Sequence, residues 1–119
     1  MAQQSASADI PQITVEELAR AIADPARPVQ AIDVREPEEL EIARLDGFAN
    51  LPLSQQASWA GEIHHRFDAE TETLVMCHHG IRSAQMCQWL WQQGFRNVKN
   101  VIGGIDAYAL AIDSSVPRY

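Results

Sequence analysis

The chain has 119 residues, of which 46% are hydrophobic and 21% charged, a composition typical of one globular domain with its own apolar core. Its formal net charge of −7 argues against nucleic acid and anionic membranes as partners, because both require a cationic surface. The sequence contains no apolar run long enough to cross a bilayer and no basic and apolar leader, so a cytoplasmic protein is expected.

Strands and helices are predicted to alternate along the chain. Short apolar runs rich in β-branched residues predict strands, and capping residues mark where helices begin and end. In chain order we expect a strand at residues 10–13, a helix from the Thr14 and Glu17 capping box to residue 23, a strand at 29–34, a helix from Pro37, a loop and strand at 45–53, a helix at 54–67, a strand at 73–77, a helix at 80–93, a strand at 98–102 and a helix at 105–112. This order predicts an α/β domain with a mainly parallel sheet, whose ligands bind beyond the carboxyl ends of the strands.

The two ends of the chain differ in composition from the segment between them. Residues 1–9 are rich in Ala, Ser and Gln without an apolar period, and are expected to form a disordered tail. A single domain is expected over residues 10–119, ending in a polar tail from residue 114.

The segment that carries chemistry is Val75-Met76-Cys77-His78-His79-Gly80-Ile81-Arg82-Ser83. A cysteine ends a predicted strand, a loop containing a glycine follows, and an arginine and a serine begin the next helix. Such a loop directs several backbone N–H groups at one point, and the helix dipole adds positive potential there. Cys77 is therefore expected to have a lowered pKa and to act as a thiolate nucleophile. Gly80 supplies backbone freedom, and Arg82 supplies a permanent charge with forked donors.

Three segments resemble motifs of the rhodanese family, and they occur in the family's order. Residues 77–83 resemble its Cys-x-x-Gly-x-Arg-Ser active-site loop, Asp33-Val34-Arg35-Glu36 resembles its Asp-x-Arg signature, and residues 97–105 resemble its closing Val-x-x-Leu-x-Gly-Gly segment. The resemblance implies a rhodanese-like three-layer domain, with a five-stranded, mainly parallel sheet and helices on both faces.

The same resemblance implies a sulfurtransferase without a cofactor or a metal. Cys77 would take sulfane sulfur from a donor such as thiosulfate or a persulfide, and pass it to cyanide, a small thiol or a protein cysteine. Asp33 is expected to anchor the active-site loop and Arg35 to be structural. The loop that binds the substrate anion through its backbone N–H groups would consist of His78, His79, Gly80, Ile81, Arg82 and Ser83.

Some side chains near Cys77 have more than one interpretation. Arg82 either faces the anionic end of the donor or forms a salt bridge that braces the loop. Ser83 is expected to be a helix-start cap, and Cys87 a packed core thiol. We hypothesise that one imidazole of the His78-His79 pair tunes the Cys77 thiol or assists proton transfer.

The sequence also departs from the family pattern and leaves other functions open. The usual Gly-His-Ile-x-Gly-Ala segment reads Ala43-Arg44-Leu45-Asp46-Gly47-Phe48, and Tyr108 stands where a tryptophan often occurs, which bears on specificity. Related phosphatases have five residues between cysteine and arginine, whereas four separate Cys77 from Arg82, so a phosphatase or arsenate reductase is disfavoured. A non-catalytic rhodanese-like binding module is the other alternative. A zinc site at the histidine pairs is not expected, because adjacent residues rarely chelate one ion.

Overall fold

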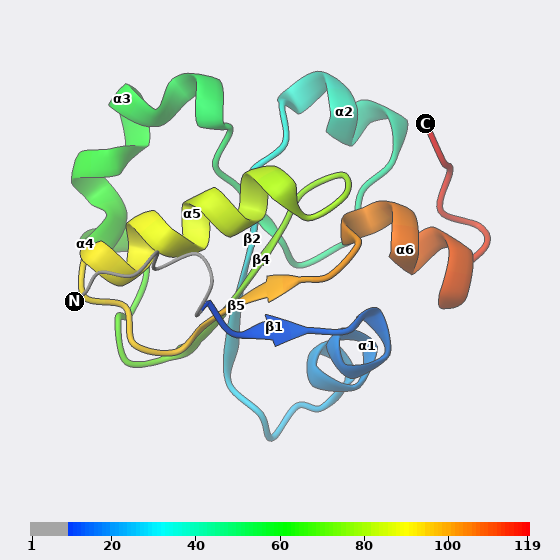
Figure 1. Ribbon diagram of the computed structural model, residues 1–119, viewed down its shortest axis with the longest axis horizontal. Coiled ribbons are helices and arrows are strands. Elements are labelled where there is room, and N and C mark those ends of the chain that lie inside the picture. The colour runs from blue at the N-terminus through cyan, green and yellow to red at the C-terminus, as the bar shows by residue number, and fades with distance from the viewer. Residues whose placement is uncertain (1–9) are drawn as a thin grey trace.

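A five-stranded sheet forms the centre of the computed structural model, which describes residues 10–119 (Figure 1). The strand order is β1-β5-β4-β2-β3, and every neighbouring pair is parallel. The strands are β1 (Gln12–Ile13), β2 (Val29–Asp33), β3 (Ala49–Asn50), β4 (Glu72–Met76) and β5 (Val98–Val101). The predicted α/β class and five-stranded sheet are confirmed, while the tail predicted at residues 1–9 lies outside the described residues.

The pairing of β2 with β4 determines where the site lies. Its register runs from Val29 opposite Glu72 to Asp33 opposite Met76, so the two strands end together. Because parallel strands point the same way, the residues that follow them leave the sheet at one edge. Arg35 and Cys77, which are distant in sequence, therefore lie at the same edge of the sheet.

Residues 10–119 form six α-helices, and five of them lie on the two faces of this sheet. The six helices are α1 (Val15–Ala23), α2 (Pro37–Ile42), α3 (Gln56–Trp59), α4 (Ile63–Arg66), α5 (Ile81–Gln92) and α6 (Gly104–Ala111). Helices α3, α4 and α5 cover one face, and α1 and α6 cover the other (Figure 1). In β4, Val75 is buried towards α5, whereas Leu74 and Met76 are buried towards α1 and α6. Both faces are thus covered, which explains why the strand ends in consecutive apolar residues, Leu74, Val75 and Met76.

The segment predicted as one helix over residues 54–67 is helical from Leu53 to Arg66, but it is divided into short α-helical and 3₁₀ pieces. Two 3₁₀ turns, Leu53–Gln55 and Ala60–Glu62, flank α3, and the second separates it from α4. Gly61 lies in that second turn and weakens helix formation there, while Trp59 is fixed by its indole N–H, which donates to the Pro52 carbonyl at 2.8 Å. Within residues 10–119, no helix has the length and apolar content needed to span a membrane.

The polar tail predicted from residue 114 is also corrected by the structure. Val116 is buried against the α1 and α6 side of the core, and Arg118 forms an ion pair with Asp106 on α6. Tyr119 reaches the loop that follows β4. Tertiary contacts therefore order this segment, although its own sequence contains no pattern of a helix or a strand.

Candidate functional site

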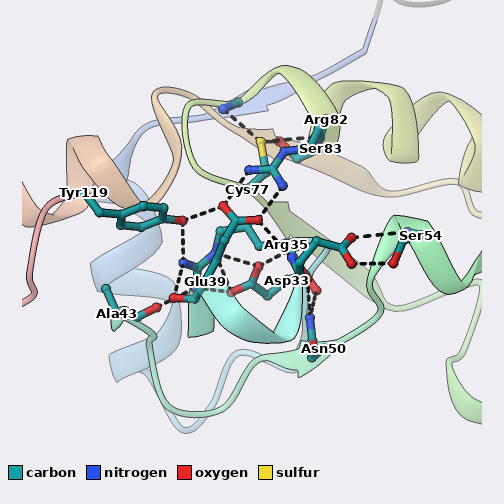
Figure 2. A network of polar contacts seen from close by, with 12 residues as sticks. Asp33, Arg35, Glu39, Ala43, Asn50, Ser54, Cys77, Arg82, Ser83 and Tyr119 are labelled. Atoms are coloured by element: carbon teal, nitrogen blue, oxygen red, sulfur yellow. Dashed lines mark hydrogen bonds and ion pairs between the residues drawn. The ribbon is translucent and has the colours of Figure 1, made fainter. Parts of the chain in front are cut away.

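Cys77 lies at the end of β4, where the chain turns into α5. Its Sγ accepts hydrogen bonds from the N–H of Gly80 at 3.1 Å and from the N–H and hydroxyl of Ser83 at 3.4 and 3.3 Å (Figure 2). Gly80 has a φ of +101°, the left-handed conformation that turns its N–H back towards the sulfur. Residues 77–83, hereafter the Cys77 loop, therefore surround the sulfur with donors.

These donors change the acidity of the thiol. Burial raises the pKa of Cys77, which is 1% exposed, but hydrogen bonds from Ser83, Gly80 and the His79 backbone outweigh it and hold the pKa below its ordinary value. Cys87, on α5, is buried in the same apolar core, and burial raises its pKa to about 12. The expectation that Cys87 is a packed core thiol is confirmed, and the two cysteines differ sharply in thiolate character.

Ser83 does not cap the helix as predicted. The cap of α5 is Gly80, and Ser83 is the third residue of the helix, fully buried. Its hydroxyl lies 2.5 Å from Oδ1 of Asn100, on β5, and Nδ2 of Asn100 donates to the Gly80 carbonyl at 3.1 Å. The Asn100 side chain thus holds two of the residues of the Cys77 loop that donate to the sulfur, Gly80 and Ser83.

The N-terminus of α6 also holds the Cys77 loop, through hydrogen bonds to its backbone carbonyls. The N–H groups of Ile105 and Asp106 donate to the carbonyls of Cys77 and His78 at 2.9 and 3.2 Å. A Cβ on Gly104 would overlap both carbonyl oxygens, so only glycine allows this close approach. The Gly-Gly segment therefore sets how closely α6 packs on the Cys77 loop.

Arg82 is held by Glu39, on α2. The guanidinium donates to both carboxylate oxygens, with Nη1–Oε2 2.7 Å and Nη2–Oε1 3.0 Å (Figure 2). These bonds, with further ones from the Glu36 N–H and the Tyr119 hydroxyl, lower the pKa of Glu39 to about 2 despite partial burial. Of the two interpretations of Arg82, this geometry agrees with a salt bridge that braces the loop, and not with an arginine that faces the donor.

Asp33 and Arg35 form a buried ion pair beneath this contact. Nη2 of Arg35 lies 2.7 Å from Oδ2 of Asp33, and its Nε and backbone N–H both donate to Oδ1 at 3.0 Å. The Asp33 carboxylate therefore holds Arg35 and not the Cys77 loop, in contrast to its expected role as an anchor. The connection to the loop is indirect, since the Tyr119 hydroxyl accepts from Arg35 Nη1 at 2.8 Å and donates to Glu39 at 2.8 Å.

The paired histidines lie beside Tyr119. The His78 ring stacks on the Tyr119 ring at 3.8 Å between centroids, and the tilted His79 ring lies 3.9 Å from the His78 ring between centroids. Burial and the neighbouring His79 lower the pKa of His78, which favours its neutral form. The hypothesis that an imidazole tunes Cys77 stays a prediction. Among residues 10–119, no group of three or more His, Cys, Asp or Glu side chains is placed to hold a metal ion.

Comparison with known proteins places this loop in a family. The model for the rhodanese-like domain matches residues 14–111, which include the whole Cys77 loop and the Asp33-Arg35 pair. The chain belongs to the rhodanese-like domain family. The crystal structure of a rhodanese-like domain protein from Staphylococcus aureus has the same fold, with a TM-score of 0.73 over 92% of this chain and 99% of that chain at 24% identity.

Two relatives of this rhodanese-like domain differ in length and name. The chloroplastic Rhodanese-like/PpiC domain-containing protein 12 of Arabidopsis thaliana is 46% identical over 92% of this chain, which spans 38% of that protein. The thiosulfate sulfurtransferase GlpE of Shewanella oneidensis is 32% identical over 70% of this chain and 78% of that protein. Sulfurtransferases are therefore among the relatives of the chain, and its cytoplasmic location stays a prediction.

Sequence reasoning missed four residues that shape the site of this rhodanese-like domain. Glu39 lies in the helix predicted from Pro37, and Gly104 lies in the segment that resembles the family's closing motif, but the sequence predicts no contact with the Cys77 loop for either. Asn100 carried a signal, because it is a polar residue in a run that otherwise predicts a buried strand. Tyr119 carried none, since its contacts depend wholly on the path of the C-terminal segment.

Proposed function

We propose that this rhodanese-like domain is a sulfurtransferase that carries sulfane sulfur as a persulfide on Cys77. The observation that supports this most directly is the convergence of Gly80 and Ser83 donors on the Cys77 sulfur. They favour the thiolate, which is the nucleophilic form, and they can stabilise the negative charge of a persulfide in the same position. The sulfurtransferase relatives support the same activity.

The transfer has two steps that balance without a cofactor. The Cys77 thiolate attacks the outer sulfur of thiosulfate or of an organic persulfide, and a new S–S bond forms at Sγ. The S–S bond of the donor breaks, and its electron pair leaves with sulfite or with a thiolate. An acceptor, either cyanide or a thiolate, then attacks the outer sulfur of the Cys77 persulfide, which restores the Cys77 thiolate and releases thiocyanate or a new persulfide.

The structure favours this reaction over hydrolysis of a phosphoester. The loop from Cys77 to Arg82 is short, and the forked guanidinium of Arg82 is bound to Glu39 at 2.7 and 3.0 Å. It is therefore not free to hold the oxygens of a phosphate in the observed arrangement. A phosphatase or arsenate reductase would need an arginine turned towards the transferred group.

Intact-mass measurement after incubation with thiosulfate, and separately with an organic persulfide, tests the proposal. The wild type and Cys87→Ser should gain about 32 Da, the mass of one sulfur atom, and Cys77→Ser should not. Cys87→Ser is the matched control, because that cysteine is buried with a raised pKa. A gain on Cys77→Ser, or none on folded wild type with either donor, would contradict the proposal. In the second case a binding module would be favoured, and Cys77-dependent hydrolysis of p-nitrophenyl phosphate would instead favour a phosphatase.

A further inference from the structure

Three arginines near the Cys77 loop are engaged with carboxylates. Arg82 forms a forked pair with Glu39, Arg35 with Asp33, and the more distant Arg118 pairs with Asp106 at 2.9 Å. Arg82 is the one arginine within the loop, and its side chain is only 35% exposed in that pair. The positive charge of Arg82, which the loop could otherwise offer to an anion, is thus neutralised by the adjacent Glu39 carboxylate.

Helix α2 adds more negative charge beside this pair. Its N-cap is Glu36, its interior contains Glu38, Glu39 and Glu41, and its last turn contains no basic residue. Glu39 has a pKa of about 2, so it is fully ionised at neutral pH and holds one negative charge against Arg82. A doubly charged anion that approaches Cys77 therefore meets paired cations and additional carboxylates, and gains little from long-range attraction.

We infer that Glu39 is a specificity-determining residue, which cancels the charge of Arg82 and thereby favours organic persulfide donors over the thiosulfate dianion. The inference rests on the proposed sulfur transfer. Thiosulfate brings two negative charges to the Cys77 thiolate and releases doubly charged sulfite, whereas a simple organic persulfide brings one and releases a singly charged thiolate. The two steps form the same bond at Sγ and break one S–S bond each. The two donors differ in their negative charge, and the Glu39–Arg82 pair sets the net charge that they meet beside Cys77.

The ratio of two rate constants isolates this effect. The second-order rate constant for persulfide formation on Cys77 is measured by quenched intact-mass analysis at low ionic strength, with thiosulfate and with the persulfide of 2-mercaptoethanol. Changes in stability, loop position or thiolate fraction act on both donors, so they largely cancel in the thiosulfate-to-persulfide ratio. The ratio in the wild type alone is not the test, because the donors differ in intrinsic reactivity.

Two single variants change the charge of the pair in opposite directions, and the double variant restores its neutrality. Glu39→Gln frees the Arg82 charge and should raise the ratio about fivefold, which corresponds to ~1 kcal/mol for one extra unit charge near the surface. Arg82→Gln leaves Glu39 alone and should lower the ratio by a similar factor. The double variant is neutral again and should return the ratio to within about twofold of the wild type.

Glu72→Gln is the matched control. Glu72 also has a pKa of about 2 and is likewise held by basic side chains, Arg27 and Lys99, but it lies at the opposite end of β4 from Cys77. Its ratio should equal that of the wild type. An unchanged ratio in folded Glu39→Gln, or a shift of both single variants in the same direction, would overturn the inference. Failure of the proposed function is distinct, because then neither donor would add sulfur to the wild type.

Discussion

Replacing Gly104 with alanine should disturb the Cys77 loop from the side of α6. Gly104 has a φ of +60°, and a Cβ there would overlap the carbonyl oxygens of Cys77 and His78. The same two carbonyls accept from the N–H groups of Ile105 and Asp106. The added methyl group must therefore move either the N-terminus of α6 or the backbone that positions the nucleophile.

The size of this effect follows from two contributions. A left-handed conformation costs a non-glycine residue about 1–2 kcal/mol, and overpacking a closely packed interior adds about 1–3 kcal/mol. Gly47 separates them, because its φ is +89° and no atom lies within 4 Å of an added Cβ. We expect Gly104→Ala to lower the free energy of unfolding by about 2–5 kcal/mol, and Gly47→Ala by about 1–2 kcal/mol.

Two measurements check the reasoning. Urea denaturation gives the free energy of unfolding of both variants, and the pH dependence of iodoacetamide alkylation reports the pKa of Cys77. In Gly104→Ala the pKa of Cys77 should rise, because the displaced loop no longer directs its N–H groups at the sulfur, whereas in Gly47→Ala it should match the wild type. Equal destabilisation in the two variants together with an unchanged alkylation profile would refute the steric account.

Two further predictions concern the charged groups. Arg35→Gln leaves the buried Asp33 carboxylate without its cation and should lower the free energy of unfolding by about 3–5 kcal/mol. Arg118→Gln removes the cation of an exposed pair and should change the free energy of unfolding far less, so equal losses in urea denaturation would contradict this reasoning. Hydrogen bonds from arginine lower the pKa of Glu39 and of Glu72 from 4.5 to about 2. Their contribution to stability is therefore present above pH 4.5 and lost as the pH falls towards 2. Acid unfolding followed by circular dichroism should be less steep in Glu39→Gln and Glu72→Gln, and identical profiles would argue against a role of these pairs.

The sequence correctly predicts features of local structure that depend only on neighbouring residues. Thr14 and Glu17 form the predicted capping box at the start of α1, with the Glu17 N–H donating to the Thr14 hydroxyl at 3.1 Å. Gly80 adopts the left-handed conformation that the turn after Cys77 requires. Both features depend on the intrinsic geometry of a few consecutive residues, so they can be predicted without knowledge of the fold.

Where local signals compete, the prediction was less complete. The helix predicted over residues 54–67 is interrupted because Gly61 weakens it and the 3₁₀ turn at residues 60–62 changes the direction of the chain between α3 and α4. Serine is a residue type that often caps helices, so the sequence predicts a cap at Ser83. In the structure Ser83 is buried beside Asn100, and its hydroxyl contacts the Cys77 sulfur and the Asn100 side chain on β5. Helix propensity decided the first case, and burial, which the sequence does not state residue by residue, decided the second.

The sequence by itself determined the order of strands and helices and the cysteine-centred loop at a helix N-terminus, because these follow from hydrophobic period and from the chemistry of consecutive residues. Only the tertiary structure decided the partners of that loop. Glu39 binds Arg82, Asn100 binds Gly80 and Ser83, and Tyr119 stacks on His78, each across a long separation in sequence. Such contacts require that the register of a parallel sheet and the path of the C-terminal segment be fixed first, and the packing of the whole core sets both.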